Sequence, residues 1–342
     1  MSDIARRKVE HIDIVMQGEA ARATTPTGFE RIRFMHEALP NLDLAAIDLT
    51  TQFVGRQVAA PLFVNSMTGG PQVSASLNRH IAEACAQVKV GFGVGSQRIA
   101  LEGQGDSGLG RALRQSAPDV PILANFGAAQ LRTWDGPDSA RRAVDMIEAD
   151  ALVLHLNPLQ EAVQEGGDTD WRGLLSKIEE VCTRSSFPVL AKEVGAGLGG
   201  ATARRLVDVG VAGIDVAGLG GTSWAAVEGA RARTEQGRAK AEAFRDWGIP
   251  TADALRSVRA TCPDVTVVAS GGLTSGLDSA KAIRLGADMT AIAAGVLPAA
   301  IAGTDALVAH LEGLVEQLRI ACFCTGSADL AALAQAPLLE GA

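Results

Sequence analysis

The stretch ALVLHLNPLQE, residues 151–161, joins a buried strand to a group of chemically active side chains. Its apolar start is typical of a strand that is buried on both faces, and the polar residues follow at the carboxyl end. His155 and Asn157 alternate with leucines, so on a strand their side chains lie on one face. Gln160 and Glu161 come next, in what we expect to be a loop. Parallel α/β enzymes position catalytic side chains in this way, although loops after strands are often polar simply because they face solvent.

The same alternation of an apolar run and a helix-like stretch continues along most of the chain. The strand-like runs lie at residues 61–65, 90–94, 121–125, 151–156, 188–193, 212–217, 265–270 and 289–293. The helix-like stretches lie at residues 73–87, 109–116, 139–148, 171–183, 201–209, 223–245, 276–285 and 304–322. Eight such units in about 260 residues match the count and size of a (β/α)8 barrel. We therefore predict an α/β fold, a (β/α)8 TIM barrel with an N-terminal extension.

No linker-like segment interrupts this pattern. The predicted parts are the extension, the barrel and a C-terminal tail, at residues 1–60, 61–325 and 326–342. Within the extension we expect a helix near residues 6–11, a short helix over 29–38 and a hairpin strand at 52–57. The Arg-rich excursion at 218–250 could be a lid over the barrel mouth or an ordinary solvated helix.

Composition narrows the class of protein. The 342 residues are 47% hydrophobic and include 38 glycines, which suits a buried parallel sheet with tight turns. The net charge is −8 and no dense basic run occurs, so we expect no nucleic-acid partner. The longest weakly polar run, 289–303, is too short for a membrane span. Five scattered cysteines and an N-terminus without an apolar signal segment predict a cytoplasmic protein with reduced thiols.

All eight predicted strands end in glycine or small polar residues, which indicates a ring-shaped binding face at one end of the barrel. Gly271 and Gly272 follow the seventh strand, and Ala293 and Ala294 follow the eighth. Glycines let backbone N–H groups approach a phosphate, and these two loops are the usual phosphate site of the fold. We therefore predict a phosphate-binding cradle at this position.

Two charged residues at strand ends have several interpretations. Lys192 could form a Schiff base, hold negative charge on a flavin ring or a phosphate, or form a buried ion pair with Glu193 or Asp215. Glu161 is the candidate metal ligand, because a hard divalent ion commonly bridges a carboxylate and substrate phosphates. The alternative is a surface carboxylate. No His or Cys pattern indicates zinc.

Residues 195–200 read Gly-Ala-Gly-Leu-Gly-Gly and match the dinucleotide fingerprint G-x-G-x-x-G, with Asp215 at the end of the next strand. A dinucleotide-binding fold carries this pattern in its first βα unit, whereas here it lies in the fifth. We therefore give this interpretation little weight.

Eight short motifs extend along the chain in a fixed order. They are RKxEHI at 7–12, NSMTGG at 65–70, GSQR at 95–98, ANxGA at 124–128, HLNxxQE at 155–161, KEVG at 192–195, GGTSW at 220–224 and ASGGL at 269–273. Together they resemble the type 2 isopentenyl-diphosphate isomerases, which are flavin-dependent (β/α)8 barrel enzymes. The resemblance extends from Arg6 to about Leu297.

The resemblance implies a role for particular residues. Those implied to bind FMN are Ser66, Met67, Thr68, Ser96, Asn125, Lys192, Thr222, Gly271, Gly272, Ala293 and Ala294. Those implied to bind the substrate are Arg7, Lys8, His11, Ser96, Arg98, His155, Asn157 and Gln160. Gln160 and His155 would be the catalytic groups, and Glu161 would bind Mg²⁺.

The implied reaction interconverts isopentenyl and dimethylallyl diphosphate in isoprenoid biosynthesis by proton addition and elimination. The flavin must be reduced, with NADPH as the reductant, although no net redox change occurs. The strand ends carry few titratable residues, which agrees with a reaction that relies on its cofactor for proton transfer. The resemblance further implies a homotetramer or a homo-octamer.

The chain departs from the family at two places, and two other functions stay open. Ala217 stands where the family often has Ser, and residues 164–168 read Gln-Glu-Gly-Gly-Asp where Gln-Pro-Glu-Gly-Asp is usual. One alternative is an FMN-dependent 2-hydroxy-acid oxidase or dehydrogenase, which needs a His base and an Arg where residues 271–274 read Gly-Gly-Leu-Thr. The other is a non-catalytic barrel that binds flavin or a polyphosphate.

Overall fold

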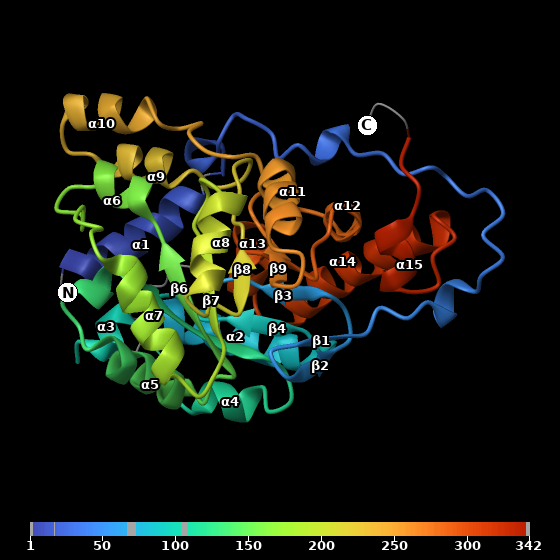
Figure 1. The fold of residues 1–342 in the computed structure, drawn as a ribbon, viewed down its shortest axis with the longest axis horizontal. Coiled ribbons are helices and arrows are strands. Elements are labelled where there is room, and N and C mark those ends of the chain that lie inside the picture. The colour runs from blue at the N-terminus through green and yellow to red at the C-terminus, as the bar shows by residue number, and fades with distance from the viewer. Residues whose placement is uncertain (1–2, 17, 67–72, 104–107, 340–342) are drawn as a thin grey trace.

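The computed structural model describes residues 3–16, 18–66, 73–103 and 108–339. Eight parallel strands close into a barrel in the order β10-β3-β4-β5-β6-β7-β8-β9 (Figure 1). They are β3 (Leu62–Val64), β4 (Gly91–Gly93), β5 (Ile122–Gly127), β6 (Ala151–Leu156), β7 (Val189–Glu193), β8 (Gly213–Asp215), β9 (Thr266–Ala269) and β10 (Met289–Ile292). Each strand falls within or next to a predicted apolar run, so the (β/α)8 barrel is confirmed.

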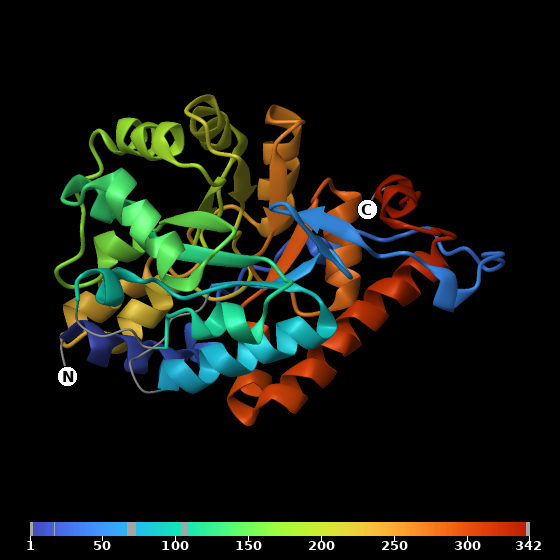
Figure 2. The same cartoon turned by 90° about the horizontal axis from the view of Figure 1, so that it is seen from below.

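Helices surround the barrel. They are α2 (Val73–Val88), α4 (Ala112–Ser116), α5 (Gly136–Ile147), α7 (Leu174–Arg184), α8 (Gly200–Asp208), α11 (Thr251–Thr261), α12 (Gly276–Arg284) and α14 (Thr304–Cys324). Figure 2 shows the long helix α14 lying along α2. Helix α5 shows how local sequence sets the two ends of a helix. Asp135 caps its first turn, and the helix ends where Glu148 adopts a left-handed conformation with φ of 50°. Between these signals its buried residues recur at helical spacing, so one face packs on the barrel.

The predicted helix-like stretch 223–245 is helical, but it is divided into two helices. Helix α9 (Trp224–Arg231) ends at Ala232, which has an extended conformation. Helix α10 (Glu235–Glu242) then begins with Thr234 as its cap, whose side chain accepts a hydrogen bond from the backbone N–H of Gly237. A Thr that caps a helix has a non-helical backbone, so it interrupts what would otherwise be a continuous helix.

Two similar arginine–aspartate pairs, called the arginine clamps below, lie at the amino-terminal end of the barrel. Arg114 Nη2 lies 2.6 Å from Asp150 Oδ2, and Arg259 Nη2 lies 2.5 Å from Asp288 Oδ2. Each aspartate also accepts a backbone N–H from the start of the neighbouring strand, that of Ile122 in β5 or that of Val267 in β9. The same sequence pattern, Arg-x-x-x-Pro-Asp-Val, occurs at residues 114–120 and 259–265. The same kind of contact therefore occurs in two βα units that lie four strands apart in the barrel.

A hairpin of the N-terminal extension packs beneath the barrel. Strands β1 (Thr51–Phe53) and β2 (Arg56–Val58) pair around a two-residue turn in which both φ angles are positive. Phe53 is buried and its ring lies 5.5 Å from that of Phe63. The hairpin therefore covers the inward-facing residues at this end, and the predicted strand at 52–57 is confirmed as part of it.

The rest of the extension reaches both the barrel mouth and the chain's other end. Helix α1 (Asp3–Met16), which includes the predicted helical segment, packs against α9 (Figure 1). The predicted short helix over 29–38 is wrong: only the turn Phe29–Arg31 is helical, in 3-10 form. The chain then extends, and the backbone N–H of Met35 donates to the oxygen of Pro337 in the C-terminal segment at 2.9 Å. That distant pairing overrides the local preference for helix.

The five cysteines are free thiols, and three of them, Cys85, Cys262 and Cys322, are buried. Burial raises the pKa of the Cys322 thiol to about 11, so this group stays protonated at neutral pH. Within the described ranges, no helix is long and apolar enough to cross a membrane.

Candidate active site

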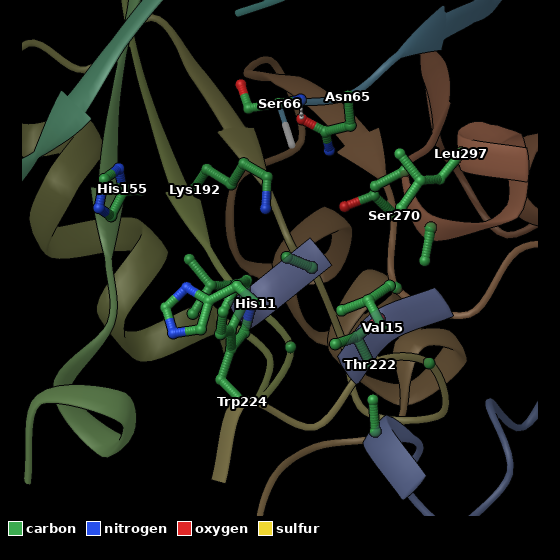
Figure 3. A pocket seen from close by; sticks show the side chains of 18 of the residues that line it. His11, Val15, Asn65, Ser66, His155, Lys192, Thr222, Trp224, Ser270 and Leu297 are labelled. Carbon is green, nitrogen blue, oxygen red and sulfur yellow. Dashed lines mark hydrogen bonds between the residues drawn. The ribbon is translucent and has the colours of Figure 1, made fainter. Parts of the chain in front are cut away.

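A cavity of about 470 Å³ lies at the carboxyl ends of the barrel strands. Side chains that follow each of the eight strands line it, and helix α1 covers one side. In Figure 3, His11 and Val15 of α1 face the cavity across from Lys192, Asn65 and Ser270. A cavity of this size, with polar groups that converge from several strands, is typical of a cofactor and substrate site.

The structure brings most of the predicted site residues into this one cavity. Those that line it are His11, Ser66, Ser96, Arg98, Asn125, His155, Asn157, Gln160, Glu161, Lys192, Thr222, Gly271, Gly272, Ala293 and Ala294. Met67 and Thr68 lie outside the described residues. Arg7 and Lys8 belong to α1, but their side chains are outside the described part of the chain.

The predicted phosphate cradle has a backbone that only glycine tolerates well. Gly271 and Gly272 have φ angles of 102° and 74°. A Cβ atom on Gly272 would lie 2.5 Å from the oxygen of Gly220, and one on Gly271 would overlap the backbone of Gly218. The loop after β9 therefore packs directly on the loop after β8, and its backbone faces the cavity without side chains. This geometry fits a phosphate group.

A buried polar network connects the ends of three strands beside the cradle. Asp215 accepts hydrogen bonds from Asn65 Nδ2 at 2.7 Å and from Ser270 Oγ at 2.6 Å. All three residues are buried. Within the described residues, no partner reaches the buried hydroxyl oxygen of Ser66, which also lines the cavity. An unsatisfied buried hydroxyl next to a glycine cradle fits a bound cofactor that supplies the missing hydrogen bond.

Lys192 has a partner other than a carboxylate. Its ammonium group donates to the backbone oxygen of Glu193 at 2.6 Å. In the described part of the chain, no ion pair joins Lys192 to Glu193 or Asp215, so the ion-pair interpretation is wrong. The ammonium stays within the cavity, where it can meet a negatively charged group on a ligand.

The glycine-rich segment 195–200 is not available to a dinucleotide. Glu193 Oε2 accepts hydrogen bonds from four consecutive backbone N–H groups, those of residues 194–197, at 2.5 to 3.1 Å. Burial raises the pKa of the Glu193 carboxyl, and the backbone N–H groups and Lys192 oppose that rise. These N–H groups form an anion-binding nest whose anion is a side chain of the protein itself.

The side chains after β6 are held at the start of a helix. Helix α6 (Pro158–Val163) begins immediately after Asn157, so Gln160 and Glu161 are helical, and their prediction as loop residues was wrong. Proline at a first helical position favours this start. Asn157 Nδ2 donates to Glu161 Oε1 at 2.9 Å and to Gln160 Oε1 at 3.0 Å. One amide therefore orients both neighbouring side chains.

The surroundings of Glu161 fit a hard cation. Its carboxylate is buried, and Oε2 accepts hydrogen bonds from the backbone N–H of Asp168 at 2.7 Å and from the side chain of Gln164. Among the described residues, none donates to the buried oxygen Oδ1 of Asn157. The described residues contain no group of three His, Cys, Asp or Glu side chains that could hold a metal. A cation here would therefore take most of its oxygen ligands from substrate and water, as Mg²⁺ commonly does.

Two residues of the site were not predicted. Gln130 follows β5, is buried and lines the cavity. Glu228 lies on α9, where it accepts a hydrogen bond from Gln160 Nε2 at 2.9 Å and lies 3.0 Å from His11 Nε2. Burial raises the pKa of the Glu228 carboxyl, but His11, Gln160 and Arg231 outweigh burial and lower it to about 2. A glutamate within an amphipathic helix gives no sign in the sequence that it will contact residues that line the cavity.

Comparison with known proteins agrees with this architecture. The structure resembles that of a mandelate oxidase with an FMN adduct at a TM-score of 0.66, with 20% identity and 99% of each chain covered. It resembles a mandelate oxidase with (S)-mandelic acid at a TM-score of 0.65, with 21% identity and 98% and 97% covered. At these identities the likeness shows the fold alone. Residues 2–102 and 134–340 match the model of the FMN-dependent dehydrogenase family.

Curated relatives are similar over almost the whole chain. The isopentenyl-diphosphate delta-isomerase of Stutzerimonas stutzeri (strain A1501) is 60% identical, with 98% of this chain and 97% of the relative covered. Those of Xanthobacter autotrophicus (strain ATCC BAA-1158 / Py2) and Cronobacter sakazakii (strain ATCC BAA-894) are 57% and 53% identical, with 98% of this chain and 98% and 97% of each relative covered. The chain belongs to the isopentenyl-diphosphate delta-isomerases of the FMN-dependent dehydrogenase family.

Proposed function

We propose that this protein interconverts isopentenyl diphosphate and dimethylallyl diphosphate on a bound, reduced FMN, in isoprenoid biosynthesis. The observation that carries the proposal is that one cavity holds two separate regions that would each contact a phosphate group. One is the glycine cradle after β9 and β10, and the other is the group of Arg98, His155 and Asn157 after β4 and β6. A flavin phosphate and a substrate diphosphate need two such regions.

The cradle side would hold FMN. Gly271, Gly272, Ala293 and Ala294 would bind its phosphate, and the residues that would line its ring are Ser66, Met67, Thr68, Ser96, Asn125, Lys192 and Thr222. The ammonium of Lys192 would offset negative charge on the ring, because it lies in the cavity and, among the described residues, its hydrogen-bond partner is a backbone oxygen. When bound and reduced, the flavin supplies an electron-rich ring that exchanges protons with the substrate carbons.

The opposite side would hold the substrate. Arg7, Lys8, His11, Ser96, Arg98, His155 and Asn157 would anchor the diphosphate, and α1 would exclude water from the reacting carbons. Gln160 would contact those carbons and, with His155, complete the catalytic group. His155 Nδ1 lies 2.9 Å from Asn125 Oδ1, so in the tautomer that carries a proton on Nδ1 the ring donates that proton to Asn125 and is held in one orientation.

Further components belong to the same proposal. Glu161 would bind Mg²⁺ that also contacts the diphosphate, and NADPH would reduce the flavin. The active form would be a cytoplasmic homotetramer or homo-octamer, which light scattering of the purified protein can measure.

Anaerobic proton NMR in D₂O tests the reaction. The assay contains the protein, FMN, Mg²⁺, NADPH and isopentenyl diphosphate. Dimethylallyl diphosphate with incorporated deuterium, formed only when the flavin is reduced, is the expected result. No conversion by a folded, flavin-loaded protein would contradict the proposal. Reduction of the flavin by lactate or mandelate would instead support a 2-hydroxy-acid oxidase, although the described cavity takes its histidines, His11 and His155, from α1 and β6 rather than from the segment after β9.

A further inference from the structure

Asp168 connects the two charged groups on the substrate side of the cavity. Its carboxylate oxygen Oδ2 accepts hydrogen bonds from Arg98 Nη1 and Gln130 Nε2, both at 3.3 Å. Its backbone N–H donates to Glu161 Oε2 at 2.7 Å. Arg98, Gln130 and Glu161 all line the cavity. One residue therefore contacts the arginine that would bind the diphosphate and the carboxylate that would bind the cation.

The loop that carries Asp168 is held firmly in place. Trp171 Nε1 donates to the backbone oxygen of Asp168 at 2.8 Å. Gly167 packs so closely on α6 that an added Cβ would overlap the backbone oxygen of Glu161. The Asp168 side chain is nevertheless 48% exposed, so an anion that enters the cavity can replace it on Arg98. Its position is set by the fold, and its carboxylate stays accessible.

The charged residues on the substrate side of the cavity attract a cation more strongly than they attract a diphosphate. Arg98 already pairs with two carboxylates, since its Nε also lies 3.1 Å from Glu102. Asp168 and Glu161 add negative charge where a diphosphate, itself multiply negative, would have to lie. Like charges in a partly desolvated site repel one another, and a divalent cation removes that repulsion. Without the cation, a diphosphate must displace Asp168 from Arg98 and remain next to both carboxylates.

We infer that Asp168 is a positioning residue that makes diphosphate binding depend on the divalent cation, by occupying Arg98 and Gln130 until a diphosphate with its cation replaces it. This inference rests on the proposed function, because it takes the diphosphate side of the cavity from there. It explains why the arginine and the metal-binding carboxylate share one loop residue. It also predicts that removing the Asp168 charge makes the site less dependent on Mg²⁺.

Inorganic pyrophosphate is the probe, and calorimetry with the FMN-loaded protein measures its affinity with Mg²⁺ and with EDTA. In D168N the amide oxygen can still accept from Arg98 and Gln130, but the negative charge is gone. We expect metal-free pyrophosphate to bind about fivefold more tightly, the scale of one half-exposed ion pair. We expect a smaller change with Mg²⁺, so the enhancement by Mg²⁺ decreases. D168A should likewise bind metal-free pyrophosphate more tightly than wild type, and it serves as the test variant if D168N does not fold.

Asp170 provides the matched control. It lies in the same loop and pairs with Arg132 and Arg172 at 2.8 Å, but it is not among the residues that line the cavity. D170N removes the same charge and should leave both affinities within about twofold, as expected for an exposed pair. Equal affinities in D168N and D170N, or weaker binding by D168N in both buffers, would overturn the inference alone. A wild-type protein that binds no pyrophosphate in either buffer would contradict the proposed function as well.

Discussion

The carboxylate of Glu228 accepts a hydrogen bond from the side-chain amide of Gln160 at 2.9 Å. The same oxygen lies 3.0 Å from His11 Nε2, and the other oxygen accepts from Arg231 Nη1 at 2.6 Å. Gln160 therefore has a fixed orientation: its oxygen faces Asn157 and its nitrogen faces α9. Glu228 therefore joins the N-terminal helix α1 to Gln160 on α6 in one network.

Substitution of Glu228 should reduce turnover without removing FMN. In E228Q a single oxygen remains, so the side chain cannot accept from both Gln160 and Arg231, and the network that orients Gln160 must rearrange. Misorientation of a catalytic group costs roughly 10- to 100-fold in rate, and we expect kcat to fall by that amount. Flavin absorbance should stay unchanged. The control is E235Q at the start of α10, which should retain wild-type kcat. A wild-type kcat in E228Q would contradict the orienting role.

The lowered pKa of Glu228 also predicts how stability depends on pH. The pKa of the carboxyl is about 2 in the folded protein, against 4.5 for an unperturbed glutamate. The stabilisation is therefore fully present above about pH 4.5 and is lost as the pH falls toward 2. The amount is at most roughly 3 kcal/mol. Urea unfolding at pH 6 and pH 4 should show a larger loss of stability in wild type than in E228Q, and parallel losses would argue against the prediction.

The cradle glycines allow a test that separates backbone strain from lack of space. Gly272 and Gly173 share a φ of 74°, but only Gly272 has backbone atoms where a Cβ would lie. G173A should cost about 1 kcal/mol of unfolding free energy for the left-handed alanine. G272A should cost more and should also weaken FMN binding at least tenfold, because the loop must shift. Flavin fluorescence titration measures the affinity, and equal behaviour of the two variants would show that the cradle tolerates a side chain.

Lys192 should contribute to FMN affinity through its charge. K192M keeps the length of the side chain but removes the ammonium that lies in the cavity. A charge-assisted contact is worth about 1.5–3 kcal/mol, so FMN should bind at least tenfold more weakly. K177M, on the exposed surface of α7, changes the same charge far from the cavity and should bind FMN normally. Unchanged FMN affinity in K192M would exclude this role.

Much of the barrel could be predicted because its signals are local. Each strand is an apolar run that ends in glycine or a small polar residue, and each of these patterns fits within ten residues. His155 and Asn157 were found for the same reason, since they lie at the carboxyl end of a buried strand and directly after it. The hairpin before the barrel is also local, because two consecutive residues with positive φ form its turn.

The errors arose where distant segments determine the structure. The segment 29–38 pairs with the C-terminal segment, 300 residues away, instead of forming a helix. Glu228 meets Gln160 and His11 only through the fold. The helical position of Gln160 was different: Pro158 at a first helical position was a usable signal that the prediction of a loop overlooked.

The two arginine clamps should differ in their effect on stability although Arg114 and Arg259 make similar hydrogen bonds. Arg114 is 10% exposed and its partner Asp150 14%, whereas Arg259 and Asp288 are 23% and 53% exposed. R114M leaves Asp150 with one remaining partner, Arg56 at 2.5 Å, but it takes the donor away from buried backbone oxygens of Ala117 and Val120, so it should lower the free energy of unfolding by about 3–5 kcal/mol. R259M leaves an aspartate that water can reach, and should cost about 1–2 kcal/mol. Both clamps lie at the end of the barrel away from the cavity, so folded R114M and R259M should bind FMN with wild-type affinity. Urea unfolding measures the difference, and equal losses in the two variants would show that burial does not set the strength of the clamp.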